Sequence, residues 1–138
     1  MSSIFTKIIN GEIPSYKLAE SETCFAFLDI NPLAKGHTLV VPKKEVDYIF
    51  DVEDELYSDL MLFAKKVGKA IEKVVSCERI GVTVIGLEVP HAHIHLIPLN
   101  DPSEFSFSKG SKRTDDQMKE IQTKILNELK HESSKGRV

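Results

Sequence analysis

The hydrophobic and polar positions along the chain follow two different periods. Short runs in which apolar residues alternate with polar ones, or follow one another without interruption, predict β-strands. We expect five such strands, at residues 16–19, 23–29, 37–42, 80–85 and 91–97. Asn31-Pro32 and Lys35-Gly36 predict the break between the second strand and the third.

Between the third and fourth strands the period becomes helical. Apolar residues recur every three or four positions from Val52 to Val75, at Leu56, Leu60, Phe63, Val67, Ile71 and Val74. This spacing predicts one long amphipathic helix that covers the sheet. Residues 4–9 are compatible with either a short helix or an extended segment, and Gly11 and Pro14 predict a turn after them.

The character of the chain changes after Asn100. Residues 106–112 predict an irregular loop, and Thr114 to Gln117 resembles the capping box that begins a helix. The apolar stripe that follows predicts a core or a subunit contact, and consists of Met118, Ile121, Ile125 and Leu129. We expect residues 131–138 to be frayed and His131 to have no function.

Composition predicts one soluble domain, residues 1–138, with a core at 3–100 and a C-terminal loop and helix at 101–138. The chain is 41% hydrophobic and 28% charged, which suits a single core. A net charge of −3 without a basic stripe argues against polymeric nucleic acid as a partner. No apolar run predicts membrane insertion or export. Cys24 and Cys77 are expected to be reduced thiols in the cytoplasm, with Cys24 packed in the core.

The candidate chemistry lies at His91-Ala92-His93-Ile94-His95, which holds three of the five histidines. On a strand these side chains would share one face, about 6.5–7 Å apart. Three interpretations are open: a polar strand face, a metal site, or nucleophilic catalysis by an imidazole. A closed zinc site usually needs four ligands, and no cysteine or carboxylate lies at a helpful local spacing. We therefore favour catalysis.

The pattern His-apolar-His-apolar-His-apolar-apolar resembles the defining motif of the histidine triad (HIT) family. Residues 3–14 and 25–43 resemble two further segments of that family, in the expected order, and the purine-nucleoside phosphoramidase branch is the most similar. The resemblance implies an α+β fold with a five-stranded antiparallel sheet, one long helix and a C-terminal helix, joined into a ten-stranded sheet across a homodimer. It also implies a hydrolase or transferase that forms a nucleotidyl-histidine intermediate. The expected substrate is a purine nucleoside phosphoramidate or a dinucleoside polyphosphate attacked at its α-phosphorus, and no metal cofactor is needed.

The resemblance also assigns roles to four histidines. His93 corresponds to the nucleophile, and His95 to the residue that helps to bind the phosphate and leaving group. His91 corresponds to the residue that orients the nucleophile. His37 matches a fourth histidine near the phosphate or leaving group; without the resemblance it would be interpreted as an exposed turn residue.

A second set of residues matches the nucleoside site. Asp29 corresponds to the acid that binds the ribose hydroxyls, although its position also suits a turn residue before Asn31-Pro32. The positions that line the base pocket in relatives, some of which could equally be core, are Ile4, Phe5, Ile8, Ile13, Phe27 and Ile30.

Two departures from the family pattern bear on function. Relatives have a polar, phosphate-binding loop before the triad, whereas residues 85–90 here are shortened and place Glu88 and Val89 beside the expected phosphate. A carboxylate there repels a polyphosphate unless it is protonated, turned away or bridged by a cation, and Glu88 could instead bond a histidine. Some bacterial relatives bind a structural zinc partly through Cys-x-x-Cys, but Ser3 and Thr6 stand at those places, so we expect that zinc site to be absent.

Two other functions remain open at this point. One is a nucleotide-binding or regulatory module that turns over slowly. The other is a metal-dependent hydrolase in which the histidine triad provides the ligands.

Overall fold

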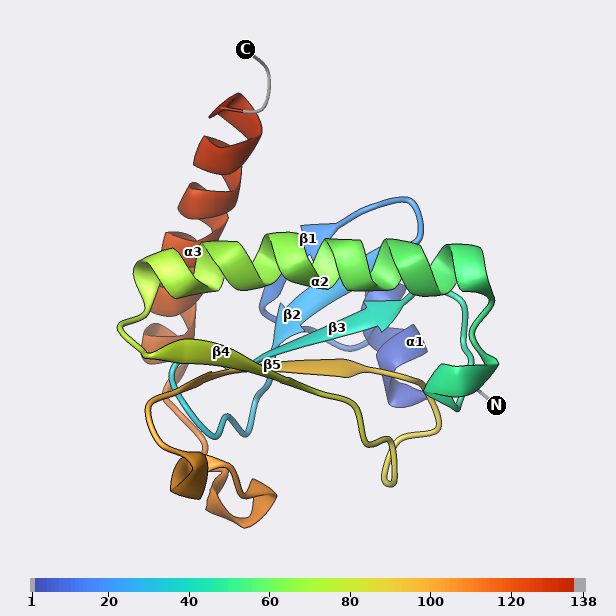
Figure 1. Ribbon diagram of the computed structural model, residues 1–138, viewed down its shortest axis with the longest axis horizontal. Helices are drawn as coiled ribbons and strands as arrows, with labels where there is room; N and C mark the ends of the chain where they lie inside the picture. Colours follow the sequence, from blue (N-terminus) through green and yellow to red (C-terminus); the bar gives the residue numbers. More distant parts are fainter. Residues whose placement is uncertain (1, 136–138) are drawn as a thin grey trace.

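The protein is an α+β domain, described here from a computed structural model that covers residues 2–135, with side chains to residue 132 (Figure 1). Its main elements in chain order are α1 (Ile4–Ile9), β1 (Lys17–Glu20), β2 (Cys24–Leu28), β3 (Thr38–Pro42), α2 (Asp54–Val74), β4 (Arg79–Thr83), β5 (Ile94–Leu99) and α3 (Asp115–Lys135). Short 3₁₀ turns lie at Ile49–Asp51, Pro102–Glu104 and Phe107–Lys109. None of the helices in the described range is long and apolar enough to cross a bilayer.

The five strands form one antiparallel sheet in the order β1-β2-β3-β5-β4. This confirms the predicted sheet with its long helix and C-terminal helix. The two edges of the sheet are β1 and β4. Because β3 and β5 are neighbours, the sheet brings His37, just before β3, close to the histidines that enter β5.

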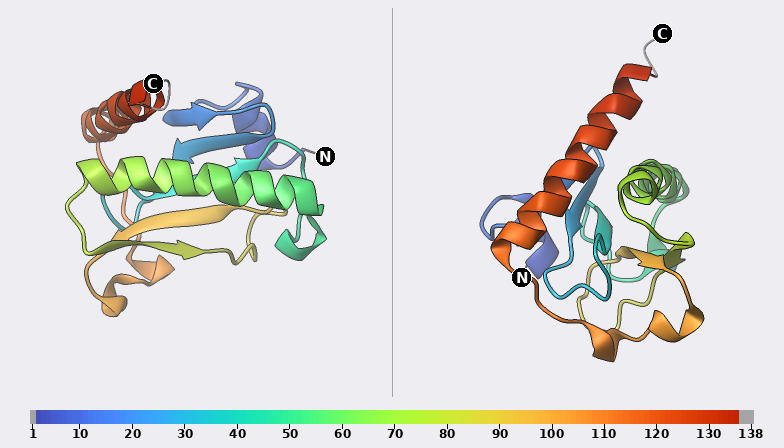
Figure 2. Two further views of the ribbon diagram at one scale, coloured as in Figure 1. Left: turned by 45° about the horizontal axis from the view of Figure 1, so that its top comes forward. Right: turned by 90° about the vertical axis from the view of Figure 1, so that its left-hand side faces the viewer.

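Alternation along the strands divides the buried residues between the two faces of the sheet. On one face, Ala26, Val40 and Leu96 pack under α2 and α3. On the other face, the second core consists of Phe25, Phe27, Leu39, Val41 and Phe5 of α1. Figure 2 shows α1 and α2 on opposite sides of the sheet. His95 pairs with Leu39 across the strands and therefore belongs to the α1 face.

The strand predicted at residues 91–97 was expected to hold all three histidines of the triad. That boundary is wrong, because β5 begins at Ile94 and therefore includes only His95. The pairing of β5 with β3 reaches only to Ile94, and its pairing with β4 reaches only to His95. His91 and His93 therefore have no strand beside them. Instead, the N–H of Ala92 donates to the carbonyl of Val46 at 2.7 Å, in the loop after β3.

The predicted capping box and apolar stripe of the C-terminal helix are both present. Thr114 Oγ1 accepts from the N–H of Gln117 at 3.1 Å, and the Gln117 side chain accepts from the N–H of Thr114 at 2.9 Å. The stripe packs in the core beside α2, so it is a contact within the chain. The prediction that the chain is frayed from residue 131 is wrong for residues 131–135, where α3 continues; residues 136–138 lie outside the described range.

Two smaller predictions concern a loop and a cysteine. Residues 106–112, predicted to be an irregular loop, contain a 3₁₀ turn. Cys24 is fully buried in the core, as predicted.

Candidate active site

The three histidines of the triad meet a fourth, His37, which is more than fifty residues away in the sequence, on the α1 face of the sheet. His37, His91, His93 and His95 are all buried, with exposed fractions of 1%, 0%, 6% and 8%. The ring centroids of His93 and His95 are 4.9 Å apart, and those of His37 and His95 are 5.3 Å apart. His131, by contrast, is exposed on α3. The interpretation of His37 as an exposed turn residue is therefore wrong.

The hydrogen bond of His93 determines which of its nitrogens is free. Its Nδ1 lies 2.8 Å from the backbone carbonyl oxygen of His91. A carbonyl oxygen can only accept, so Nδ1 carries the hydrogen and Nε2 of the neutral ring keeps its lone pair. Burial is the main cause that lowers the pKa of His93, and this favours the neutral ring. Thus His93 presents an unprotonated Nε2.

His37 and His95 form a hydrogen-bonded pair of defined direction. The N–H of Leu33 donates to His37 Nδ1 at 3.1 Å, so the hydrogen of neutral His37 is on Nε2. That Nε2–H donates to His95 Nδ1 at 3.0 Å, which leaves the hydrogen of His95 on its own Nε2. Burial lowers the pKa of His37 to about 4; burial, followed by the charges of His93 and His37, lowers the pKa of His95 to about 4. The site therefore combines one imidazole with a bare nitrogen and a neighbouring imidazole with an N–H donor.

His91 has a different role because both of its ring nitrogens are engaged. Its Nε2 is 2.8 Å from the carbonyl oxygen of Pro42, and its Nδ1 is 2.7 Å from Ser3 Oγ. The fully buried ring has no nitrogen left for a ligand. This geometry does not fit a metal held jointly by the three triad imidazoles.

Ser3 and Thr6, at the positions for which the family resemblance raised a structural zinc, place two hydroxyls beside His91. Ser3 Oγ lies 2.7 Å and Thr6 Oγ1 lies 3.5 Å from His91 Nδ1. Neutral hydroxyls are poor zinc ligands beside thiolate and imidazole. The donor set at this place therefore does not fit a structural zinc.

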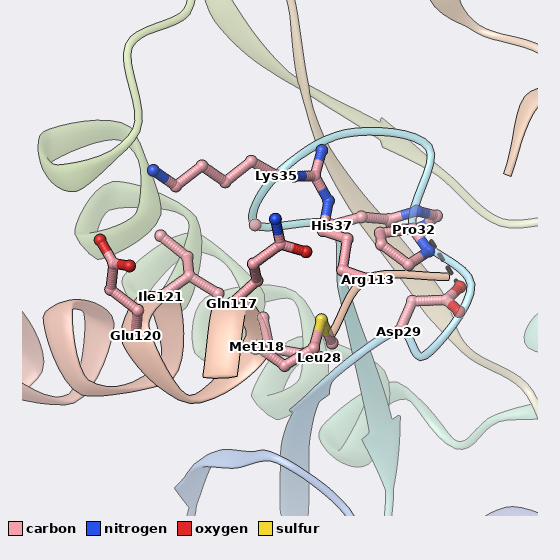
Figure 3. A pocket seen from close by; sticks show the side chains of 11 residues that line it. Leu28, Asp29, Pro32, Lys35, His37, Arg113, Gln117, Met118, Glu120 and Ile121 are labelled. Carbon is pink, nitrogen blue, oxygen red and sulfur yellow. Dashed lines mark ion pairs between the residues drawn. The ribbon is translucent and has the colours of Figure 1, made fainter. Parts of the chain in front are cut away.

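Asp29 has the turn role that its position before Asn31-Pro32 suggested, and its second oxygen lies beside the histidines. Its Oδ1 accepts from the N–H of Asn31 at 2.8 Å, which is an Asx turn, and its Oδ2 lies 3.6 Å from His37 Nε2. Figure 3 shows this carboxylate beside His37, at the edge of a cavity of about 170 Å³ that the start of α3 closes with Met118 and Ile121. Ligand atoms of Asp29, His37 and His95 lie within 4.8 Å of one another. His37 and His95 already share a hydrogen there, so a cation bound to both nitrogens would have to displace it.

The predicted base-pocket residues separate into two groups. Phe5 and Phe27 are core residues of the α1 face, and the Phe5 ring centroid lies 4.9 Å from that of His93. Ile8 is half-buried and packs on this core, and Ile13 is also half-buried. In contrast, Ile4 and Ile30 are 49% and 64% exposed. Only the second group has substantial apolar surface free for a ligand.

The loop before the triad turns Glu88 toward solvent. Glu88 is exposed, whereas the side chain of Val89 packs on the core beside α1. Within residues 2–135 no hydrogen bond joins Glu88 to a histidine, so that interpretation is wrong; the negative charge is only a minor influence that raises the pKa of His93.

Two residues of the site had no signal in the sequence. Phe107, in a 3₁₀ turn of a segment predicted to be an irregular loop, places its ring centroid 4.8 Å from that of His95. Glu45, just after β3, reaches the hydroxyl of Thr6 and the backbone of Ser3. Neither residue belongs to a local motif, and both contacts bring together segments more than ten residues apart.

Comparison with known proteins identifies the family. Residues 10–101 match the model of the HIT domain. An uncharacterized HIT-like protein of Borreliella burgdorferi is 39% identical over 116 residues, which cover 79% of this chain and 84% of that protein. The adenosine 5'-monophosphoramidase HNT1 of Saccharomyces cerevisiae is 42% identical over 99 residues, 71% of this chain and 63% of that protein, so the chain spans less than two thirds of the yeast enzyme.

The fold gives the same result. The crystal structure of a HIT-like protein of Bartonella henselae, described as involved in cell-cycle regulation and as containing an unknown ligand, superposes with a TM-score of 0.81 at 31% identity. The superposition covers 92% of this chain and 96% of that protein. With its family model, its curated relatives and its fold in agreement, the chain belongs to the histidine triad (HIT) family.

Proposed function

We propose that this protein is a nucleotide hydrolase or nucleotidyl transferase acting at the α-phosphorus of a purine nucleoside phosphoramidate or dinucleoside polyphosphate. The observation that carries the proposal is the hydrogen bond from His93 Nδ1 to the His91 carbonyl, which leaves His93 Nε2 unprotonated beside the Nε2–H of His95. The similarity to a yeast adenosine 5'-monophosphoramidase supports the substrate class.

In the proposed reaction His93 is the nucleophile. Its Nε2 lone pair forms a bond to the α-phosphorus while the bond from phosphorus to the leaving group breaks. The leaving group departs with the electron pair of that bond and takes up one proton from solvent, which the second step returns. The nucleotidyl imidazole then carries a positive charge, which the His91 carbonyl stabilises through Nδ1–H. Water breaks the phosphorus–nitrogen bond in a second step, which releases the nucleoside monophosphate and a proton and restores neutral His93.

The neighbouring histidines bind the phosphoryl group and leaving group. His95 donates its Nε2–H to them, because its Nδ1 is occupied by His37. His37 acts through His95 and has no free nitrogen of its own. His91 orients the nucleophile through its backbone carbonyl.

The nucleoside is held on the adjacent surface in this proposal. Asp29 accepts hydrogen bonds from the ribose hydroxyls, and the exposed side chains of Ile4 and Ile30 contact the purine. Phe5, Phe27, Ile8 and Ile13 support these contacts from the core or its edge. Glu88 and Val89 lie beside the phosphates, and the exposure of Glu88 allows its carboxylate to turn away from them.

We also propose a cytoplasmic homodimer with a continuous ten-stranded sheet. β4 is an edge strand, and Val82 within it is 58% exposed. An exposed apolar edge favours pairing with a second copy. The free thiols of Cys24 and Cys77 are in keeping with a reducing compartment.

The first prediction tests covalent catalysis. With adenosine phosphoramidate labelled at phosphorus, we expect a burst of amine and label retained on the protein after an alkaline quench, because histidine–phosphorus bonds survive base better than acid. His93→Ala should lose both, with kcat lower by about 10³-fold or more, and His131→Ala, on exposed α3, should retain both. Turnover by His93→Ala would overturn the mechanism. Loss of activity on chelation would instead favour the metal-dependent hydrolase, and nucleotide binding without turnover the regulatory module.

A further inference from the structure

A chain of hydrogen bonds connects Glu45 on the surface to the buried ring of His91. Glu45 Oε1 accepts from the N–H of Ser3 at 2.6 Å and from the hydroxyl of Thr6 at 2.7 Å. Ser3 Oγ lies 3.1 Å from the N–H of Thr6 and 2.7 Å from His91 Nδ1. These contacts join α1, the loop after β3 and the segment of the triad.

Each bond in this chain has one direction. The carbonyl oxygen of Pro42 can only accept, so His91 Nε2 carries the hydrogen and Nδ1 of the neutral ring must accept. The Ser3 hydroxyl is the donor to Nδ1, because this nitrogen has no hydrogen of its own. The other acceptor within reach of the Ser3 hydroxyl, Thr6 Oγ1, is farther away at 3.4 Å, and Ser3 Oγ itself accepts the N–H of Thr6. The carboxylate of Glu45 has lone pairs only, and it accepts the hydroxyl hydrogen of Thr6. Thr6 Oγ1 lies 3.5 Å from His91 Nδ1, so without Glu45 its hydrogen would compete with that of Ser3 for this nitrogen.

The inner end of this chain of hydrogen bonds lies next to the proposed nucleophile, His93. The carbonyl of His91 accepts the Nδ1–H of His93 at 2.8 Å, so the position of this carbonyl determines which nitrogen of His93 is free. Meanwhile the ring of His91 is fixed on both sides, by Ser3 and by Pro42. A ring that rotated or changed tautomer would lose one of these bonds and could displace its own carbonyl.

We propose that Ser3 and Glu45 are positioning residues that hold His91 as its Nε2–H tautomer and thereby keep Nε2 of His93 free for attack. The catalytic consequence rests on the proposed function, whereas the tautomers of the two histidines do not. The rival explanation is that Ser3 only caps α1, since its hydroxyl accepts the N–H of Thr6 at the N-cap position. The two explanations predict different effects on His91 and His93.

The experiment compares Ser3→Ala, which removes the hydroxyl, with Ser3→Thr, which retains it. Long-range ¹H–¹⁵N correlation spectra of protein labelled on histidine distinguish the two tautomers of each ring, and kcat and KM are measured with adenosine phosphoramidate. Glu45→Gln weakens the outer end of the chain. Glu22→Gln removes an exposed carboxylate in the turn between β1 and β2 and is the matched control.

We expect His91 Nε2–H and His93 Nδ1–H in the wild type and in Ser3→Thr. Ser3→Ala should give mixed tautomers and about a tenfold lower kcat with KM changed less than about twofold, because misorientation impairs the chemical step more than binding. Glu45→Gln should shift both readouts in the same direction by a smaller amount, and Glu22→Gln should shift neither. Glu45→Gln also provides the test if Ser3→Ala does not fold.

Unchanged tautomers and kcat in Ser3→Ala, with only a lower melting temperature, would show that Ser3 is no more than a helix cap and would overturn the proposal. A wild-type protein that bound nucleotide without turnover would refute the proposed function. The spectra alone would then test whether Ser3 holds the tautomers of His91 and His93. Mixed tautomers in Ser3→Ala would support that role, and unchanged tautomers would reject it.

Discussion

At the scale of single residues, the four site histidines differ in what their nitrogens contact. Both ring nitrogens of His91 are hydrogen-bonded, Nε2 of His93 is unprotonated, and Nε2–H of His37 donates a hydrogen bond to His95. These assignments follow from acceptor-only carbonyls and donor-only backbone N–H groups at the ends of each chain of bonds. The same burial that selects the neutral rings makes them sensitive to acid.

We predict that the free energy of unfolding falls as the pH drops from about 6.5 toward 4. His37 and His95 have pKa values of about 4 in the folded protein, against 6.5 for the ordinary side chain, and the pKa of His93 is also lowered. The unfolded chain therefore binds protons that the native state excludes, and each such proton costs about 1.4 kcal/mol per pH unit in this window. Urea titrations between pH 7 and pH 4.5 measure the slope.

His37→Asn provides the comparison for that slope. This change removes one titrating ring and should make the pH dependence shallower. The pKa of Glu20 is lowered to about 2 by hydrogen bonds from Lys17 and Lys43, so this group also destabilises the fold as the pH falls through about 4.5. The histidine contribution is therefore taken from the slope above about pH 5.5, where such carboxyl groups are ionised in both states. A stability that stayed constant from pH 6.5 to 4.5 would contradict the assignment of neutral, buried histidines.

At the scale of elements, local signals position the helices, while pairing partners determine where the strands end. The capping box of Thr114 and Gln117 begins α3 as the local sequence predicts. β5, in contrast, begins three residues later than the apolar alternation suggested, because neither β3 nor β4 extends far enough to pair with His91. A strand boundary depends on its neighbours as well as on its own residues.

We predict that Thr114→Ala lowers the free energy of unfolding by about 1 kcal/mol. The substitution removes the oxygen that accepts the N–H of Gln117 at 3.1 Å. Thr123→Ala, at an exposed position inside α3, should be neutral or slightly stabilising because alanine has the higher helix propensity. Chemical denaturation measures both changes, and equal effects of the two variants would argue against the cap.

At the scale of the whole molecule, one face of the sheet carries the main hydrophobic core and the other carries the histidine site. α2 and α3 cover one face with an apolar core, and α1 covers the other (Figures 1 and 2). The triad lies on the α1 side, where the ring of Phe5 contacts those of His91 and His93. β1 is covered by contacts with α3, whereas β4 has an exposed apolar side chain at the opposite edge. This asymmetry points to β4 as the edge for the proposed homodimer.

We predict a dimer for the wild type by light scattering and a shift toward monomer for Val82→Lys. A lysine on an edge strand disfavours pairing because its charge would be brought against the second copy. Thr123→Lys adds the same charge on exposed α3 and should leave the dimer intact. A monomeric wild type, or a Val82→Lys variant that remained dimeric, would exclude an interface through β4.

What the sequence determined by itself was local or periodic in character. The helical period from Val52 to Val75, the capping box and the spacing of the triad each report neighbours along the chain, and they were enough to predict most of the helices and strands and three of the site histidines. The fold class and the role of His37 came from the resemblance to the HIT family, because His37 alone carries no local signal. Only the tertiary structure decided which nitrogen of each histidine is free, that Glu45 reaches Ser3, and that Phe107 lies beside His95. The physical reason is that hydrophobic period reports backbone geometry and burial, whereas hydrogen-bond partners and ring contacts between distant segments exist only after the chain has folded.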